Sequence, residues 1–333
     1  MTAAASRLGV FEGPGALTRF LNPENHPPIP LVELPDHLNP FRNSGVRIFG
    51  KLMYLLPLLN IKSLPAINML LEAQAAGKLD GVNTIIESSS GNTVFSLGVA
   101  AKLFDIQRVI AILPWDIAPG KLDLLRLCGV EPRLNRSAVD QPTGIALARD
   151  EGKKPGCFNP AQYENDANPR AYEKWVLPQI WQQTEGRLTV FAAGLGTSGT
   201  LVGASRYFAN NGSKVTLVGV ICNQQSAVPG VRSEACLREV SLPWRTSADS
   251  VVEAGTKESF KQSLDLCRAG LMAGPSSGFA LAGLLKFLEN RERDSSLDPL
   301  RNEDGEVIAT FICPDTPLPY LDKYSTHLDP SDF

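Results

Sequence analysis

The chain has 333 residues, of which 43% are hydrophobic and 20% are charged, and its formal net charge is -3. This length exceeds one ordinary hydrophobic core, and the composition is typical of a globular protein. The small net charge gives no electrostatic reason to expect nucleic acid or an anionic membrane as a partner. The sequence also shows no apolar run of 18 residues and no secretion signal, so we expect no membrane association.

Cysteine and histidine are placed in a way that excludes several kinds of site. The six cysteines are scattered without a Cys-x-x-Cys pair, which indicates reduced thiols in the cytoplasm rather than disulfides or zinc. The three histidines, His26, His37 and His327, lie near the termini and show no metal-ligand spacing. We therefore expect no metal site and no Ser-His-Asp hydrolase, and any proton must be moved by another side chain.

Short apolar runs alternate with helix-length segments after an irregular arm of forty-five residues that is rich in proline, asparagine and glycine. The first series is predicted as strand Val46–Lys51, helix Pro65–Ala76, strand Thr84–Glu87, helix Asn92–Phe104, strand Arg108–Leu113, helix Pro119–Cys128 and strand Glu131–Leu134. The second is helix Arg170–Thr184, strand Leu188–Ala193, helix Gly199–Asn210, strand Lys214–Val220, helices Ser259–Cys267 and Ser277–Asn290, and strand Val307–Ile312. This alternation predicts an α/β protein with mostly parallel sheets and two lobes.

The most informative motif reads GLGTSGT and follows an apolar strand at the start of a helix. Its glycines allow a tight turn, and the free N–H groups of the helix start favour an anion. The pattern also satisfies GxGxxG, but the next strand ends Val220–Gln224 without the acidic residue that a dinucleotide site usually has. A single phosphate is therefore favoured, although a purely structural turn stays open. The predicted phosphate-binding residues are Gly194, Gly196, Thr197, Ser198, Gly199 and Thr200.

Two further helix starts are rich in glycine and in side-chain oxygen. Residues 87–93 read ESSSGNT, and residues 274–278 read GPSSG. Hydroxyl, amide and backbone N–H groups suit a carboxylate, while ordinary helix capping explains each motif equally well when it is taken alone. Three such helix starts in one chain indicate a cleft for a small polyanionic ligand.

Together these segments resemble the cysteine synthase and cystathionine β-synthase family of pyridoxal-phosphate enzymes, fold type II. The substrate loop of that family, Thr-Ser-Gly-Asn-Thr, is matched by Ser89 to Thr93. Its phosphate loop, Gly-Thr-Gly-Gly-Thr, is matched by residues 196–200 with Ser198 in place of a glycine. Its Gly-Ile-Ser-Ser-Gly resembles residues 274–278, and its Pro-Asp-Ser resembles residues 314–316. The order and spacing hold from about Ile29 to Tyr324.

The cofactor lysine of the family lies in Asn-Pro-Gly-Gly-Ser-x-Lys-Asp, some thirty residues before the substrate loop. Here the same register reads LPLLNIKS and keeps the lysine as Lys62, while both glycines are leucines. The resemblance thus implies that pyridoxal 5'-phosphate forms a Schiff base with Lys62. It also implies a homodimer, with a large cofactor-binding domain of residues 1–45 and 160–333 and a small mobile substrate domain of residues 46–159.

The reaction implied by the resemblance is β-replacement on a serine-derived amino acid through an aminoacrylate. The freed amine of Lys62 would act as the general base, and Thr316 would hydrogen-bond the pyridine nitrogen. Asn92 would hold the O3′ of the ring. A β-eliminating serine or threonine dehydratase and a non-catalytic relative remain alternatives. The predicted substrate-binding residues are Ser89, Ser90, Gly91, Asn92, Thr93, Gln162, Arg232 and Ser276; an arginine at 232 suggests an anionic amino-acid partner.

Overall fold

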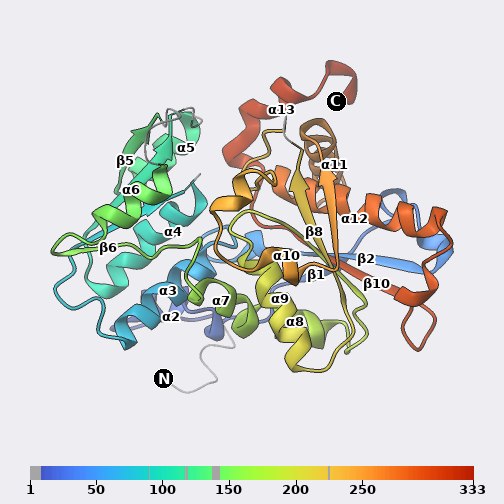
Figure 1. Ribbon diagram of the computed structural model, residues 1–333, viewed down its shortest axis with the longest axis horizontal. Helices are drawn as coiled ribbons and strands as arrows, with labels where there is room; N and C mark the ends of the chain where they lie inside the picture. Colours follow the sequence, from blue (N-terminus) through green and yellow to red (C-terminus); the bar gives the residue numbers. More distant parts are fainter. Residues whose placement is uncertain (1–8, 90, 116, 118, 137–142, 224–225) are drawn as a thin grey trace. The chain divides into compact units, whose positions relative to one another are not determined.

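The computed structural model describes residues 9–89, 91–115, 117, 119–136, 143–223 and 226–333 (Figure 1). The chain folds into two compact units. Unit 1 comprises the described residues up to Pro27 together with Leu56–Ala171, and unit 2 comprises Pro28–Leu55 together with Tyr172–Phe333. Each unit is therefore built from two separate stretches of the sequence.

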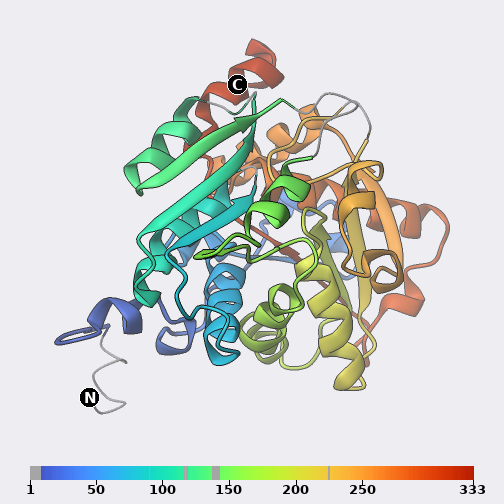
Figure 2. The same cartoon turned by 60° about the vertical axis from the view of Figure 1, so that its left-hand side comes forward.

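Unit 1 contains a parallel four-stranded sheet in the order β5-β4-β3-β6, which is most easily followed in Figure 2. Its two central strands are short, largely buried apolar runs, as expected for a parallel sheet that is covered by helices. The strands are β3 (Thr84–Ser88), β4 (Arg108–Pro114), β5 (Val130–Asn135) and β6 (Cys157–Phe158). The helices are α2 (Ala16–Leu21), α3 (Ser63–Ala75), α4 (Asn92–Ala100), α5 (Pro119–Leu127), α6 (Gly144–Glu151) and α7 (Ala167–Trp175), which crosses the boundary between the units.

Helices cover both faces of the unit 1 sheet. On one face, Ile86, Ile110 and Ile112 form a small core with Ala148 of α6. On the other face, α4 approaches so closely that a Cβ at Gly98 would overlap the side chain of Val130. In chain order, α4 is the next helix after the carboxyl end of β3.

Unit 2 contains a six-stranded sheet in the order β1-β2-β10-β7-β8-β9, in which only the β1 and β2 pair is antiparallel. The strands are β1 (Leu31–Glu33), β2 (Val46–Lys51), β7 (Val190–Gly194), β8 (Thr216–Cys222), β9 (Ser250–Ala254) and β10 (Val307–Ile312). The helices are α8 (Leu177–Gln183), α9 (Gly199–Asn210), α10 (Trp244–Ser247), α11 (Thr256–Arg268), α12 (Pro275–Arg293) and α13 (Leu321–His327).

Two adjacent residues of β8 show that the unit 2 sheet is also covered on both faces. Gly219 faces α9, because its Cβ position lies 3.2 Å from the side chain of Leu201. Val220 faces α12, where Gly283 leaves room for it. Since successive side chains of a strand point to opposite faces, α9 and α12 lie on opposite sides of the sheet. Because β10, β7 and β8 are parallel, the loops that follow them all begin at the same edge of the sheet.

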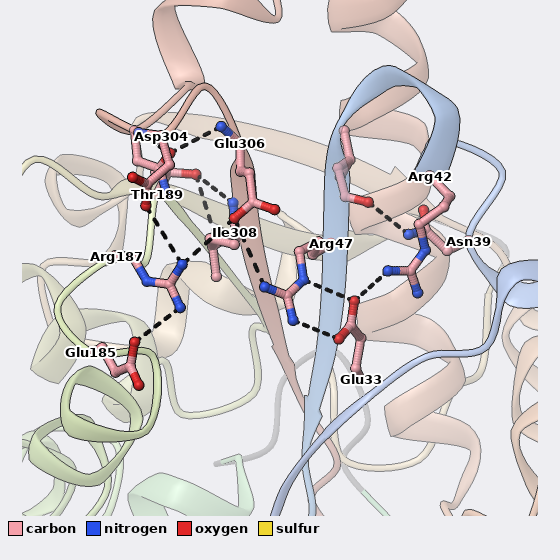
Figure 3. Close-up of polar contacts among 12 residues, drawn as sticks. Glu33, Asn39, Arg42, Arg47, Glu185, Arg187, Thr189, Asp304, Glu306 and Ile308 are labelled. Atoms are coloured by element: carbon pink, nitrogen blue, oxygen red, sulfur yellow. Dashed lines mark hydrogen bonds and ion pairs between the residues drawn. The ribbon is translucent and has the colours of Figure 1, made fainter.

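A chain of ion pairs ties together the opposite, amino-terminal end of the same strands (Figure 3). The guanidinium of Arg47 binds Glu33 at 2.7 Å and lies 3.8 Å from Glu306, which is 3.7 Å from Arg187. Hydrogen bonding from Arg47, and then from Arg42, lowers the pKa of Glu33 below its usual value. The network joins β1 and β2 to the segments that precede β7 and β10, far from the loops at the carboxyl ends.

The predicted α/β class with parallel sheets is confirmed, but the division of the chain differs from the one expected. The strand Val46–Lys51 was assigned to the small domain, yet it pairs in parallel with β10 throughout its length and belongs to unit 2. Conversely, residues 160–171 and the described residues up to Pro27 belong to unit 1. A partner strand some 260 residues away leaves no trace in local periodicity.

Several local elements also differ from the predictions. The predicted helix Arg170–Thr184 is interrupted at Val176, and the predicted helix Asn92–Phe104 ends as a 3-10 turn from Ala101. The sequence did not reveal α6, β6 or β9, which are short or of weak periodicity. In the part of the chain that the structure describes, no helix has the length and apolar character needed to cross a membrane.

Candidate active site

The predicted cofactor lysine lies in unit 1, at the residue before helix α3. Its backbone N–H donates to Oδ1 of Asn60 over 2.9 Å, and its side chain is half-buried. The same Asn60 oxygen accepts a hydrogen bond of 3.2 Å from the hydroxyl of Ser96 in α4. Asn60, which stands where the related family has serine, therefore joins the lysine loop to the helix that opens with the predicted substrate loop.

The two leucines that replace the family's glycines shape this lysine loop. Leu59 has a φ of 55°, in the left-handed region that glycine adopts without strain and leucine adopts only at a cost. Its side chain is exposed, whereas the neighbouring Ile61 is buried. The loop thus keeps a glycine-type backbone despite the substitution, held by the hydrogen bonds of Asn60 to Lys62 and to the carbonyl of Leu58.

The predicted substrate loop connects the end of β3 to the start of α4. Ser89 accepts a hydrogen bond from Gly91 N–H over 3.1 Å, and the first N–H groups of α4 begin at Asn92. Gly91 has a φ of 141°, and the side chain of Lys121 lies in van der Waals contact with its Cβ position. Ser90 lies outside the described residues. Lys121, which is 8% exposed, was missed by the sequence reasoning because a lysine in a helix is usually solvated.

Gln162, predicted from the resemblance to lie near the substrate carboxylate, is buried against this loop. Its Nε2 donates to the carbonyl of Ser88 over 2.6 Å, and its Oε1 accepts from the hydroxyl of Thr93 over 2.6 Å. Its backbone N–H donates to the carboxyl group of Glu87 over 3.1 Å. Burial raises the pKa of the Glu87 carboxyl to about 7. Thus unit 1 gathers the lysine loop, the substrate loop and Gln162, together with the unpredicted Glu87.

The predicted phosphate loop lies in unit 2, at the carboxyl end of β7 and the start of α9. Thr197, Ser198 and Thr200 are all buried. Ser198 has a φ of 67°, the conformation expected of the glycine that the related family carries there. A Cβ at Gly196 would overlap the carbonyl oxygen of Gly230, so only glycine fits that position.

Residues 229–232 pack directly against this phosphate loop. The backbone N–H of Arg232 donates to the carbonyl of Leu195 over 2.8 Å. The guanidinium of Arg232 donates to the carbonyl of Cys236 over 3.2 Å and lies 3.7 Å from the carboxylate of Glu239. The backbone of Arg232 thus lies beside the phosphate loop, while its side chain contacts residues of its own segment, and its predicted contact with an anionic substrate stays a prediction.

The third motif lies beside the segment that contains Thr316. The N–H of Gly274 donates to the carbonyl of Asp315 over 2.9 Å, and the hydroxyl of Ser276 donates to the carboxylate of Asp315 over 3.2 Å. A Cβ at Gly194 would come within about 3.0 Å of the Phe279 ring of α12, so the first and third motifs are neighbours. The first motif follows β7, and the Asp315 segment that the third motif contacts follows the adjacent parallel strand β10; α/β proteins bind ligands at such carboxyl ends.

Comparison with known proteins identifies the family. The model of the family described as "Pyridoxal-phosphate dependent enzyme" matches residues 24–297. Cysteine synthase B of Salmonella typhimurium is 31% identical over 290 residues, which cover 85% of this chain and 89% of that protein. This chain is a member of the pyridoxal-phosphate-dependent enzyme family.

Solved structures of two such enzymes share the fold of this chain. The O-acetylserine-dependent cystathionine β-synthase from Helicobacter pylori superimposes with a TM-score of 0.75 at 24% identity, over 89% of this chain and 94% of that one. O-ureido-L-serine synthase gives a TM-score of 0.75 at 22% identity, over 91% and 93%. The predicted family, the cofactor pyridoxal 5'-phosphate and the class of a cysteine synthase-like β-substituting enzyme are confirmed.

The phosphate loop of this enzyme suits a cofactor phosphate. The hydroxyl oxygen of Ser198 is buried and has no hydrogen-bond partner among the described residues. A buried hydroxyl without a partner is costly, and a phosphate oxygen would satisfy it. The start of the twelve-residue helix α9 adds free N–H groups and the positive end of the helix dipole.

Proposed function

We propose that this enzyme carries out β-replacement on a serine-derived amino acid, giving a β-substituted alanine. The observation that carries the proposal is the hydrogen-bonded link through Asn60 between the loop of Lys62 and helix α4, which opens with the substrate loop. This link keeps an amine and a set of carboxylate-binding donors in one unit. The cysteine synthase relative, whose match covers most of both chains, supports the same reaction class.

The residues of unit 2 would hold the cofactor. Gly194, Gly196, Thr197, Ser198, Gly199 and Thr200 would bind its phosphate, and Thr316 would hydrogen-bond its pyridine nitrogen. When bound, pyridoxal phosphate withdraws electrons from the amino acid and makes its Cα–H acidic. A neutral threonine hydroxyl at the nitrogen, in place of a carboxylate, favours replacement at Cβ over transamination.

The residues of unit 1 would bind and deprotonate the amino acid. Ser89, Thr93 and the first N–H groups of α4 would hold its carboxylate, and Asn92 would orient the ring oxygen of the cofactor. The amine of Lys62 would take the Cα proton, which is why the enzyme needs no histidine. No hydrogen bond or ion pair involving the Lys62 ammonium group is found within the described residues, so the group is available for this role.

Visible spectroscopy of the purified enzyme tests the proposal. We expect an absorption band near 410 nm, as the family resemblance implies, that shifts when O-acetylserine or O-phosphoserine is added. Adding a thiol or an amine should then yield a new amino acid, which mass spectrometry detects. Pyruvate as the main product in the presence of the nucleophile would indicate a β-eliminating lyase. A protein that carries no such band and responds to no serine derivative would contradict the proposed reaction.

The identities of the leaving group and of the nucleophile are finer proposals. We propose an anionic substrate, either O-phosphoserine as donor or an acidic amino acid as nucleophile. This proposal is based on Arg232, whose guanidinium lies near the carboxylate of Glu239. The cytoplasmic location and the homodimer stay predictions. Light scattering during size-exclusion chromatography tests the second of these.

A further inference from the structure

Glu87 is a buried acid at the end of strand β3, immediately before the substrate loop. Glu87 is only 1% exposed to solvent. One carboxyl oxygen accepts the N–H of Ser88 over 2.8 Å, and the other accepts the N–H of Gln162 over 3.1 Å. One acidic side chain thus holds donors from two segments that lie far apart in sequence.

Gln162 extends this link to the far end of the substrate loop. Its side-chain amide bridges the carbonyl of Ser88 and the hydroxyl of Thr93, each over 2.6 Å. The backbone carbonyl of Gln162 accepts a hydrogen bond of 2.7 Å from the side-chain amide of Asn168. Hydrogen bonds therefore run without a break from Glu87 to both ends of residues 88–93.

A carboxyl group suits this position because it offers acceptor sites in several directions, whereas an amide of the same size offers one oxygen only. If one oxygen were replaced by an NH₂ group, a backbone N–H would face another donor. Buried donors without acceptors are costly, so the two segments would move apart rather than keep this contact.

We propose that Glu87 is a positioning residue of the substrate loop: it fixes the backbone at Ser88 and Gln162 so that Ser89 and residues 91–93 present their donors to the amino-acid carboxylate. This inference rests on the proposed function. Glu87 is buried beneath the loop and acts through its neighbours. A role in stability alone would lower the free energy of unfolding and leave the substrate affinity of the folded enzyme unchanged.

Glu87→Gln in the holoenzyme tests the proposal. The apparent Kd for O-acetylserine, measured from the spectral change of the bound cofactor, should rise by about ten- to a hundred-fold. The KM should rise with it and kcat should fall much less, and the spectrum before substrate addition should match the parent. Glu72→Gln is the matched control, since Glu72 is an acid of the same unit that binds Arg170 at the surface; its Kd should stay within about two-fold.

Asn168→Ala is a milder second variant for the case that Glu87→Gln does not fold. It removes the support of the Gln162 carbonyl without touching the loop, and the Kd should rise several-fold. If the parent responds to O-acetylserine and both variants bind it as tightly as the parent does, the positioning role is wrong while the proposed function stands. If the parent itself responds to no serine derivative, the proposed function fails, and this inference fails with it.

Discussion

Lys51 offers a stringent test of how unit 2 is held together. It is a fully buried lysine at the end of β2, and its ammonium group donates to the carbonyl of Ile29 over 2.7 Å. It also donates to the side-chain oxygens of Gln179, over 2.9 Å, and of Gln183, over 2.8 Å. The segment before β1, the strand β2 and helix α8 therefore meet at one nitrogen atom.

Replacing Lys51 by Met keeps the length of the side chain and removes its three donors. Two of the acceptors keep another partner, because Ile29 N–H binds Gln179 and the Gln183 amide binds the Ile29 carbonyl. Only Oε1 of Gln183 loses its partner, at a cost of about 1–3 kcal/mol, and at pH values below about 7, where the amine is charged in the folded protein, the lost bonds from a charged donor add to this cost. Relief from burying the ammonium group offsets part of it. We expect Lys51→Met to lower the free energy of unfolding by about 2 kcal/mol.

The effect should also depend on pH. Burial lowers the pKa of Lys51 to about 7, from an ordinary value near 10.5. Between these values the unfolded chain binds more protons at this site than the folded chain, so the site stabilises the fold increasingly as the pH rises. The stability difference between the parent and Lys51→Met should therefore grow between pH 7 and pH 9, by at most about 1.4 kcal/mol per pH unit.

Urea denaturation followed by tryptophan fluorescence at several pH values measures both effects. The exposed Lys214 of the same unit supplies the control, since Lys214→Met should change the stability by less than about 0.5 kcal/mol. A Lys51→Met variant that is as stable as the parent at every pH would refute the reasoning. In that case the three hydrogen bonds would only balance the cost of burying the ammonium group.

Three further predictions concern the proposed active site. Borohydride reduction should fix the cofactor to Lys62, and Lys62→Ala should abolish the adduct; label on a different lysine, found by peptide mapping, would show the assignment to be wrong. Gly196→Val should weaken the retention of pyridoxal phosphate by more than about ten-fold in equilibrium dialysis, because a Cβ at this position would displace the loop from the carbonyl of Gly230. Tight binding of NAD to the parent would overturn the phosphate assignment. If Arg232 binds an anionic substrate, Arg232→Ala should lower kcat/KM for O-phosphoserine by about ten-fold or more, and Glu239→Gln, which removes the carboxylate that competes with the substrate for the guanidinium, should raise it. Equal effects of either variant on O-acetylserine and O-phosphoserine would remove Arg232 from substrate recognition.

Elements and motifs with local causes could be predicted from the amino-acid sequence. The strands at 46–51 and 307–312 and the helix at 199–210 have the predicted bounds, because apolar runs and a glycine-rich helix start act within a few residues. Glycine and hydroxyl residues at strand ends pointed to an anion site, and their order along the chain pointed to the family. The family itself follows from that order and from the relatives that share it.

The pairing of these segments and the burial of particular polar side chains depend instead on contacts between distant parts of the chain. Pairing of β2 with β10 moves it from the expected small domain to unit 2, and this partner lies too far along the chain for periodicity to reveal it. Lys51 and Glu87 look like ordinary charged residues in the sequence, since most lysines and glutamates are solvated. Their burial depends on donors and acceptors from segments distant in sequence, at Gln179 and Gln183 for the first and at Gln162 for the second. Such groups are brought together by chain topology, which local sequence patterns do not encode.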